Sequence, residues 1–179
     1  MRKMMSGILA VLMLAGCNAK ESKQQQSLTQ PEKKVEIAAE GKEAPDFTLT
    51  DNNGMPLTLS SLRGQYVVLD FWGTWCKWCV KGIPDMKAYY DKYNGKFEIL
   101  SIDFGDSEET WQNAIEDYGM EWLHVITDED SAPMLQELYA IEGYPTKMII
   151  DPNGRIIHIT VGEAPAFYEF LDDLFGKKK

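Results

Sequence analysis

From residue 41 onward, apolar runs alternate with amphipathic segments along the chain. Residues 66–72 (YVVLDFW) are almost all apolar, as expected for a strand buried on both faces of a sheet, and residues 97–103 predict a second buried strand. The pattern between them predicts a helix over residues 76–93, with a kink at Pro84. Because strands alternate with helices, the sequence indicates an α/β fold built on one sheet.

Two short segments near the start of this region predict a β-hairpin. Residues 47–49 and 57–59 flank residues 51–54 (DNNG), a run of turn-forming residues. The other expected elements are helices over residues 107–118 (capped by Ser107), 131–139 (capped by Ser131) and 164–175, strands over residues 122–127, 147–150 and 156–161, and a turn over residues 151–154.

The first 40 residues differ from the rest of the chain. A basic start precedes the uncharged residues 4–16, a run too short to cross a hydrocarbon core of roughly 30 Å, and this combination is typical of a secretory signal. Residues 18–40 are polar and lack aromatic side chains, so they cannot bury enough surface to offset the entropy of the chain. We therefore expect a signal peptide over residues 1–16, a flexible tether over residues 17–40 and a folded domain over residues 41–179.

Charge and cysteine content exclude several classes of protein. The 179 residues include 18 Lys and Arg against 28 Asp and Glu, which gives a formal net charge of −10. Nucleic-acid binders normally carry a basic surplus, so we expect no nucleic-acid partner. The three cysteines, Cys17, Cys76 and Cys79, are too few for a small fold held together by disulfides.

Cys76 and Cys79 come directly after a buried strand and begin the predicted helix. The first thiol therefore lies at a helix N-terminus, where the positive end of the helix dipole favours the thiolate. We expect Cys76 to be a nucleophile that attacks a partner disulfide and Cys79 to be the resolving thiol. Lys77 and Trp78 between them should tune the thiol pKa and the redox potential.

A Cys-x-x-Cys pair is also half of a structural zinc site. Such a site needs four ligands, and with Cys17 assigned elsewhere the remaining nitrogen candidates are His124 and His158. Both histidines lie on predicted strands remote in sequence from the pair. We therefore expect no metal site.

The run YVVLDFWGTWCKWC resembles the strand–loop–helix of the thioredoxin superfamily. More narrowly, it resembles the membrane-anchored thiol–disulfide reductases of the TlpA and ResA type. Residues 41–62 are similar to the N-terminal hairpin segment of that family, and the likeness extends to the last predicted helix. The resemblance implies a thioredoxin-like fold with an N-terminal β-hairpin and a helix–strand insertion over residues 107–127.

The resemblance also implies roles for residues around the cysteine pair. Residues 143–146 (GYPT) match the cis-proline loop of the family, so Pro145 should be cis, with its loop against the disulfide and its backbone groups offered to the bound partner. Tyr144 and Thr146 on this loop, together with Trp75 beside the nucleophile, should form the docking surface.

Asp70 matches the buried aspartate of thioredoxin. An unpaired charge in an apolar strand is costly, so burial should raise the pKa of this carboxyl. Its expected role is to accept or donate the proton of Cys79, through water if necessary. The alternative is a carboxylate at a solvent-exposed strand edge.

Three positions depart from the pattern of the ResA type. Gly82 stands where a glutamate is usual, Asp70 where an asparagine is usual, and Trp78 where a proline is usual. At position 70 the chain therefore resembles thioredoxin, which has an aspartate there, more than the ResA type. We transfer no partner from the cytochrome c maturation reductases to this chain.

Residues 14–17 (LAGC) resemble the bacterial lipobox, which implies that Cys17 becomes the lipidated first residue of the mature chain. Together these features predict a monomeric thiol–disulfide oxidoreductase, anchored in the bacterial cell envelope and facing the periplasm or the exterior. It should reduce protein disulfides with electrons from an envelope donor, with the Cys76–Cys79 pair as its redox centre and no other cofactor.

Two alternative functions are a thiol peroxidase and a Cu(I) carrier. A thiol peroxidase of the peroxiredoxin type shares the segment APDF, but places a Thr or Ser three residues before its cysteine and a Pro further upstream, where this chain has Gly73 and Leu69. A Cu(I) carrier would use Cys76, Cys79 and a histidine, but the sequence shows no nearby cluster of Met or His.

Overall fold

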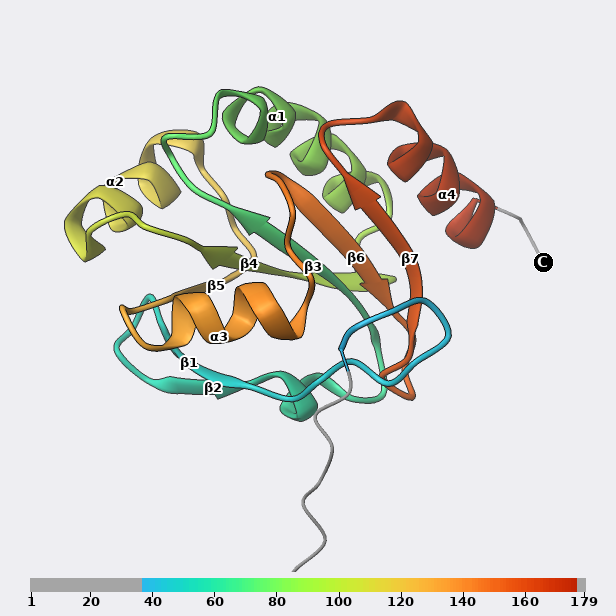
Figure 1. The fold of residues 1–179 in the computed structure, drawn as a ribbon. Coiled ribbons are helices and arrows are strands. Elements are labelled where there is room, and N and C mark those ends of the chain that lie inside the picture. Colours follow the sequence, from blue (N-terminus) through green and yellow to red (C-terminus); the bar gives the residue numbers. More distant parts are fainter. Residues whose placement is uncertain (1–36, 177–179) are drawn as a thin grey trace, which may run out of the picture. The chain divides into compact units, whose positions relative to one another are not determined.

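A seven-stranded mixed sheet organises residues 37–176, the part of the chain that the computed structural model describes (Figure 1). The predicted signal peptide, Cys17 and most of the predicted tether lie outside these residues. The elements are β1 (Thr48–Asp51), β2 (Pro56–Thr58), a short 3-10 helix (Leu59–Leu62), β3 (Tyr66–Trp72), α1 (Lys77–Lys92), β4 (Phe97–Asp103), α2 (Glu108–Tyr118), β5 (Leu123–Ile126), α3 (Ser131–Leu138), β6 (Thr146–Ile150), β7 (Ile156–Val161) and α4 (Pro165–Phe175).

The strand order is β2-β1-β5-β4-β3-β6-β7. The central strand β3 pairs parallel with β4 and antiparallel with β6, so its backbone is bonded on both sides. Both β3 and β4 have the predicted bounds, because a strand buried on both faces produces an unbroken apolar run. The α/β fold class is thereby confirmed.

The predicted hairpin and insertion are both present. β1 and β2 pair antiparallel around the turn over residues 51–54. The insertion contributes α2 and β5, and β5 pairs parallel with β4 and antiparallel with β1. The inserted strand therefore connects the N-terminal hairpin to the central sheet.

Two apolar layers pack on the two faces of the sheet. Val67, Leu69 and Phe71 of β3 point to the layer that includes residues of α3 and the hairpin. Val68 and Trp72 point to the opposite layer, which includes residues of α1, α2 and α4 (Figure 1). Since side chains alternate along a strand, Asp70 lies on the same face as Val68 and Trp72.

The ends of two helices test the predicted caps. Ser107 caps α2 as predicted, because its hydroxyl accepts a hydrogen bond from the N–H of Thr110 at 3.2 Å. The prediction that Ser131 caps the next helix is wrong, because Ser131 is the first residue of α3. The carboxylate of Asp128 instead accepts the Ser131 N–H at 2.8 Å. An aspartate three residues upstream thus accepts the N–H of the first helical residue, in place of the serine hydroxyl.

Pro84 lies inside α1, which continues past it to Lys92.

Residues 38–40, which are predicted from the sequence as the end of the tether, contact the domain. Ala38 is buried and its N–H donates to the carbonyl of Leu138, while Glu40 accepts the N–H of Ile159. In the described part of the chain, no helix has the length and apolar character needed to span a membrane.

Candidate active site

Cys76 and Cys79 form a disulfide at the N-terminus of α1, with 5.2 Å between their Cα atoms. The chain leaves β3 at Trp72, turns, and places Cys76 at the N-cap of the helix. The Cys76 Sγ accepts a hydrogen bond from the N–H of Cys79 at 3.1 Å. The sulfur thus lies where the unpaired N–H groups and the dipole of α1 stabilise negative charge.

The turn before Cys76 is fixed by the end of β4. The carboxylate of Asp106 accepts both the N–H and the hydroxyl of Thr74, each at 2.7 Å, and the Trp75 indole N–H donates to the carbonyl of Phe104 at 2.6 Å. The sequence reasoning missed Asp106. The signal in the sequence was its place just after the second predicted buried strand, which the structure pairs in parallel with β3.

Two exposed tryptophans flank the disulfide. Trp75 and Trp78 are each 56% exposed, whereas the cysteines between and beside them are buried. The Nζ of Lys81 lies 4.9 Å from the centroid of the Trp78 ring. Lys77, also predicted to tune the site, is an exposed residue in the first position of α1. These exposed side chains form an apolar and basic rim around the disulfide.

The predicted cis-proline loop lies against this rim. The Tyr144–Pro145 peptide bond is cis, and the ring of Tyr144 packs edge-on against Trp75 with 5.1 Å between the centroids. Thr146 donates its hydroxyl to the carbonyl of Gly143 at 2.7 Å, which closes the loop on itself. The loop therefore meets the cysteine segment through an aromatic contact.

Asp70 lies in the central strand β3, which is paired on both sides. The alternative interpretation, a carboxylate at a solvent-exposed strand edge, is therefore wrong. Its Oδ2 lies 3.5 Å from the Ser101 hydroxyl, and its Oδ1 has no hydrogen-bond partner among residues 37–176. Burial raises the pKa of Asp70, and the negative charge of Glu163 raises it further, while the positive charge of Lys147 lowers it. A carboxyl in such surroundings keeps its proton to higher pH than an exposed carboxyl does.

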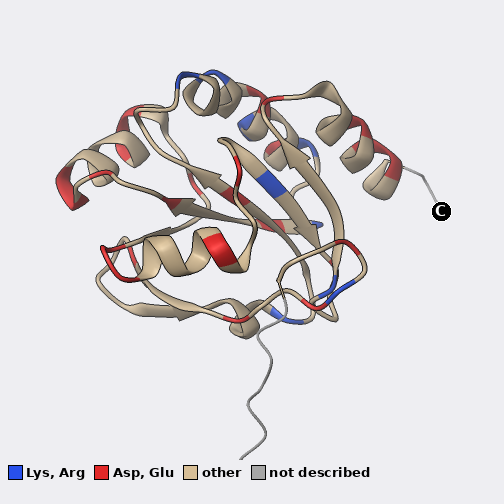
Figure 2. Ribbon diagram, viewed as in Figure 1, with Lys and Arg blue, Asp and Glu red and all other residues tan. Residues whose placement is uncertain are grey.

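Lys147 and Glu163 are two further residues beside Asp70, and neither is predicted as a site residue from the sequence. Acidic residues lie along α2 and α4, and a lysine interrupts the apolar strand β6 in the middle of the sheet (Figure 2). This lysine is Lys147, directly opposite Asp70 in the register of β3 and β6. Its Nζ lies 2.6 Å from Glu163 Oε2.

Asp103, the last residue of β4, is a second buried carboxyl beside the site. Its Oδ1 accepts the N–H of Asp106 at 3.2 Å, and its Oδ2 has no hydrogen-bond partner within the described region. Burial and the neighbouring Asp106 carboxyl raise the pKa of Asp103 to about 8. The folded protein therefore holds a proton that the unfolded chain releases near pH 3.8.

We predict that Asp103→Asn stabilises the protein at pH 8 more than at pH 5. A carboxyl whose pKa is raised on folding stabilises the folded state. This stabilisation is fully present below the pKa of the unfolded chain, and it is lost as the pH rises through the pKa of the folded protein. The difference between the two pH values should be at least about 1 kcal/mol, because one pKa unit corresponds to about 1.4 kcal/mol. Urea unfolding at both pH values measures it, and an equal effect at both would contradict the assignment.

The two histidines do not join the cysteine pair. The ring of His124 stacks on Trp122 in the buried layer, its Nε2–H donates to the carbonyl of Met120 at 3.2 Å, and burial lowers its pKa to about 4. His158 on β7 stacks on Phe170. Residues 37–176 contain no group of three or more His, Cys, Asp or Glu side chains placed to hold a metal ion.

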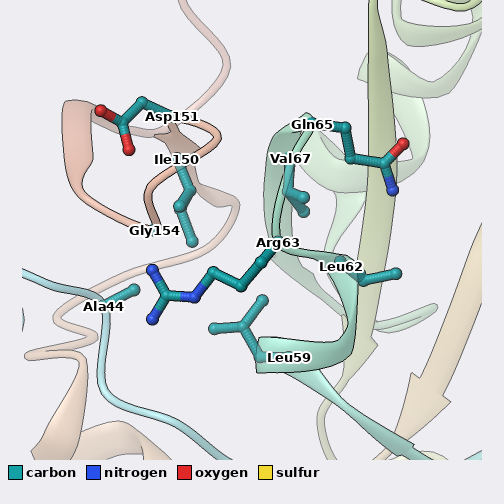
Figure 3. Close-up of a pocket in the computed structure, with 9 residues that line it drawn as sticks. All are labelled: Ala44, Leu59, Leu62, Arg63, Gln65, Val67, Ile150, Asp151 and Gly154. Atoms are coloured by element: carbon teal, nitrogen blue, oxygen red, sulfur yellow. The ribbon is translucent and has the colours of Figure 1, made fainter.

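A small pocket lies at the other end of the central strand (Figure 3). Val67 near the start of β3 and Ile150 at the end of β6 belong to its lining, whereas the disulfide follows the end of β3. The side chain of Arg63 extends toward Gly154 and binds the carbonyl of Asn153. None of the predicted site residues lines this pocket.

Comparison with known proteins identifies the family. The model of the AhpC/TSA family matches residues 40–159, and the model of the prokaryotic membrane lipoprotein lipid attachment site matches residues 1–18. The chain belongs to the AhpC/TSA family. Among curated relatives, the thiol-disulfide oxidoreductase ResA of Bacillus thuringiensis is 36% identical over 124 residues, which are 69% of this chain and 70% of that protein.

Solved structures of thiol-disulfide oxidoreductases are similar to this chain. The thioredoxin domain of a thiol-disulfide oxidoreductase from Bacteroides vulgatus superposes with a TM-score of 0.71 at 30% identity, covering 76% of this chain and 98% of the other. A thiol:disulfide interchange protein from Bacteroides sp. gives a TM-score of 0.72 at 29% identity, covering 79% and 93%. The resemblance to the TlpA and ResA type and the thioredoxin-like fold are confirmed. This AhpC/TSA member is a thiol–disulfide oxidoreductase.

Proposed function

We propose that this oxidoreductase reduces disulfides in other proteins, from a position in the bacterial cell envelope where a lipid on Cys17 anchors it. The observation that carries the proposal is the disulfide at the N-cap of α1, with the cis-Pro145 loop beside it and two exposed tryptophans around it. This arrangement offers one reactive sulfur, a second sulfur behind it and an apolar surface for a polypeptide.

The reaction has two exchange steps. In the reduced enzyme the Cys76 thiolate attacks one sulfur of the substrate disulfide, a Cys76–substrate bond forms, and the other substrate sulfur leaves as a thiolate. Cys79 then loses its proton to Asp70 and attacks the Cys76 Sγ, which forms the Cys76–Cys79 bond and releases the second substrate thiolate. Two electrons pass from the enzyme dithiol to the substrate, and the two substrate thiolates take up two protons.

The cycle needs a donor that returns two electrons to the enzyme. A dithiol protein of the envelope can do so by the same exchange in reverse, at the same surface of Trp75 and Trp78. The cysteine pair carries both electrons, so the proposal includes no further cofactor and no metal. We propose that the enzyme acts as a monomer, because the Cys76–Cys79 disulfide and the adjoining loop complete the site within a single chain.

The envelope location rests on the first residues of the chain. The lipoprotein attachment model matches residues 1–18, where Cys17 follows the lipobox-like residues 14–16. Disulfide exchange with proteins outside the cytosol agrees with that location, since disulfides persist mainly in oxidising compartments.

Peroxide reduction is the alternative activity to protein disulfide reduction. Peroxiredoxins place a Thr or Ser three residues before the reactive cysteine, where this chain has Gly73. A Cβ at Gly73 would lie 2.4 Å from the Trp75 Nε1 and 2.9 Å from the carbonyl oxygen of Phe104. The turn therefore has no room for a hydroxyl side chain at that position.

The experiment compares two substrates with the same reduced protein. We expect insulin disulfides to be reduced at a rate that depends on enzyme concentration, and hydrogen peroxide to be consumed no faster than by free dithiothreitol. Comparable turnover of peroxide and insulin would favour the peroxidase instead. A protein that reacts with neither would refute the proposed function.

A further inference from the structure

A row of polar side chains crosses the apolar layer beneath α1. Ser101 on β4, Asp70 on β3 and Lys147 on β6 are register partners, so all three point to the same face of the sheet. Their neighbours on that face, including Val68 and Ile149, are fully buried apolar residues. Polar side chains in such a layer are costly unless they are paired, which points to a function for the row.

Glu163 extends this row from the loop between β7 and α4. Its Oε2 lies 2.6 Å from the Nζ of Lys147, with only 3% of the lysine side chain and 13% of the glutamate side chain exposed. Its Oε1 accepts the hydroxyl of Tyr168 at 2.8 Å. The ion pair is therefore almost wholly enclosed, unlike the exposed pair of Lys92 and Asp172.

Gly82 provides the space for Glu163 under the active-site helix. A Cβ on Gly82 would lie 2.2 Å from the Glu163 Oε2, so any larger residue there would displace the carboxylate. Gly82 comes three residues after Cys79, which is about one turn of α1. The Glu163 carboxylate thus packs against the helix one turn beyond the resolving cysteine.

The charges in this enclosed region do not balance. Asp70 and Glu163 are two acids, and Lys147 is the one base among the described side chains that make up the row. The lysine is in direct contact with Glu163, whereas Oδ1 of Asp70 has no hydrogen-bond partner among residues 37–176. Asp70 is therefore the acid of the row that has no direct ion pair among the described residues.

We propose that Lys147 and Glu163 are positioning residues whose ion pair determines whether Asp70 can take the proton of Cys79 during disulfide exchange. This rests on the proposed function, because it concerns the step in which Cys79 is deprotonated. In that step the Cys79 S–H bond breaks, the proton passes to the Asp70 carboxylate directly or through water, and the sulfur keeps the electron pair with which it attacks Cys76.

The groups that face Asp70 from the packed elements define the electrostatic effect. They are Lys147 from β6, Glu163 from the β7–α4 loop and Tyr168 from α4, with Cys79 on α1 over the same face. Lys147 lowers the pKa of Asp70 and Glu163 raises it. Neutralising Glu163 leaves the lysine unopposed, so Asp70 should lose its proton at lower pH.

The test follows the titration of Asp70 in the reduced protein by carbon-13 NMR of its carboxyl carbon, with the pH profile of mixed-disulfide resolution as the second readout. We expect Glu163→Gln to move both to lower pH. Adding Lys147→Met to Glu163→Gln should move both back to higher pH, because the unopposed positive charge is then gone. A purely structural role would lower the melting temperature in both variants without this reversal.

A third variant perturbs the pair without changing any charge. Gly82→Ala should displace Glu163 and shift the Asp70 titration, and it should cause no shift when Glu163 is already alanine. Asp172→Asn, which breaks the exposed pair with Lys92, is the matched control and should leave the titration unchanged.

Two failures can be told apart. If the wild type reduces insulin but Asp70 titrates at the same pH in the wild type and in Glu163→Gln, this inference alone is overturned. A wild type that reduces no protein disulfide would overturn the proposed function first, and the inference with it.

Discussion

Cys76→Ser should abolish the reduction of insulin disulfides, with a fall in rate of about a thousandfold or more, because it removes the nucleophile. Cys79→Ala should instead keep the first exchange step and accumulate mixed disulfides between Cys76 and its substrates. The contrast follows from the helix: the Sγ of Cys76 lies at the N-cap of α1, whereas Cys79 lies inside the first turn and contributes an N–H to that sulfur.

Initial rates of insulin reduction, and non-reducing gels of the protein incubated with oxidised insulin, measure these two outcomes. Far-ultraviolet circular dichroism of each variant serves as the folding control, since neither substitution changes the size of the side chain greatly. If Cys76→Ser accumulated mixed disulfides and Cys79→Ala did not, the assigned roles of the two cysteines would be reversed.

Asp70→Asn should slow the resolution of a mixed disulfide by about a hundredfold at pH 7, the low end of general acid–base effects. The same substitution should raise stability at alkaline pH. Burial raises the pKa of Asp70, so the wild-type carboxyl favours folding at low pH and loses that contribution as the pH rises through its folded pKa. An uncharged amide of equal size has no such loss.

The combination of a slower reaction and a more stable protein is the distinguishing result. Stopped-flow fluorescence of mixed-disulfide resolution and urea unfolding at pH 8 give the two quantities. Asp117→Asn, an exposed position on α2, is the matched control and should change neither. Full resolution activity in Asp70→Asn across the pH range would remove Asp70 from the reaction.

The sequence predicted the elements that rest on local pattern. β3 and β4 have the expected bounds because their apolar runs are continuous, and Ser107 caps α2 because a capping serine acts on residues two or three positions away. The cis Tyr144–Pro145 bond was expected from the family resemblance alone, since an X-Pro pair by itself indicates only a turn.

The parts that sequence reasoning missed depend on contacts between distant segments. Asp106 reaches Thr74 across 32 positions, and the pairing of Lys147 with Asp70 depends on which strand lies next to β3. In the sequence, Gly82 indicates only that a side chain is absent from α1. In the structure, Glu163 from the β7–α4 loop fills the space beside it. A single chain gives no local signal for such complementarity.

The reduction potential of the Cys76–Cys79 couple tests the central claim most directly. It is measured by equilibrating the protein in dithiothreitol redox buffers and following tryptophan fluorescence, to which Trp75 beside the disulfide contributes. A reductant of protein disulfides should have a potential near that of thioredoxin, about −270 mV. A potential near that of the strong oxidant DsbA, about −120 mV, would contradict the account, because the enzyme would then donate its disulfide rather than its dithiol.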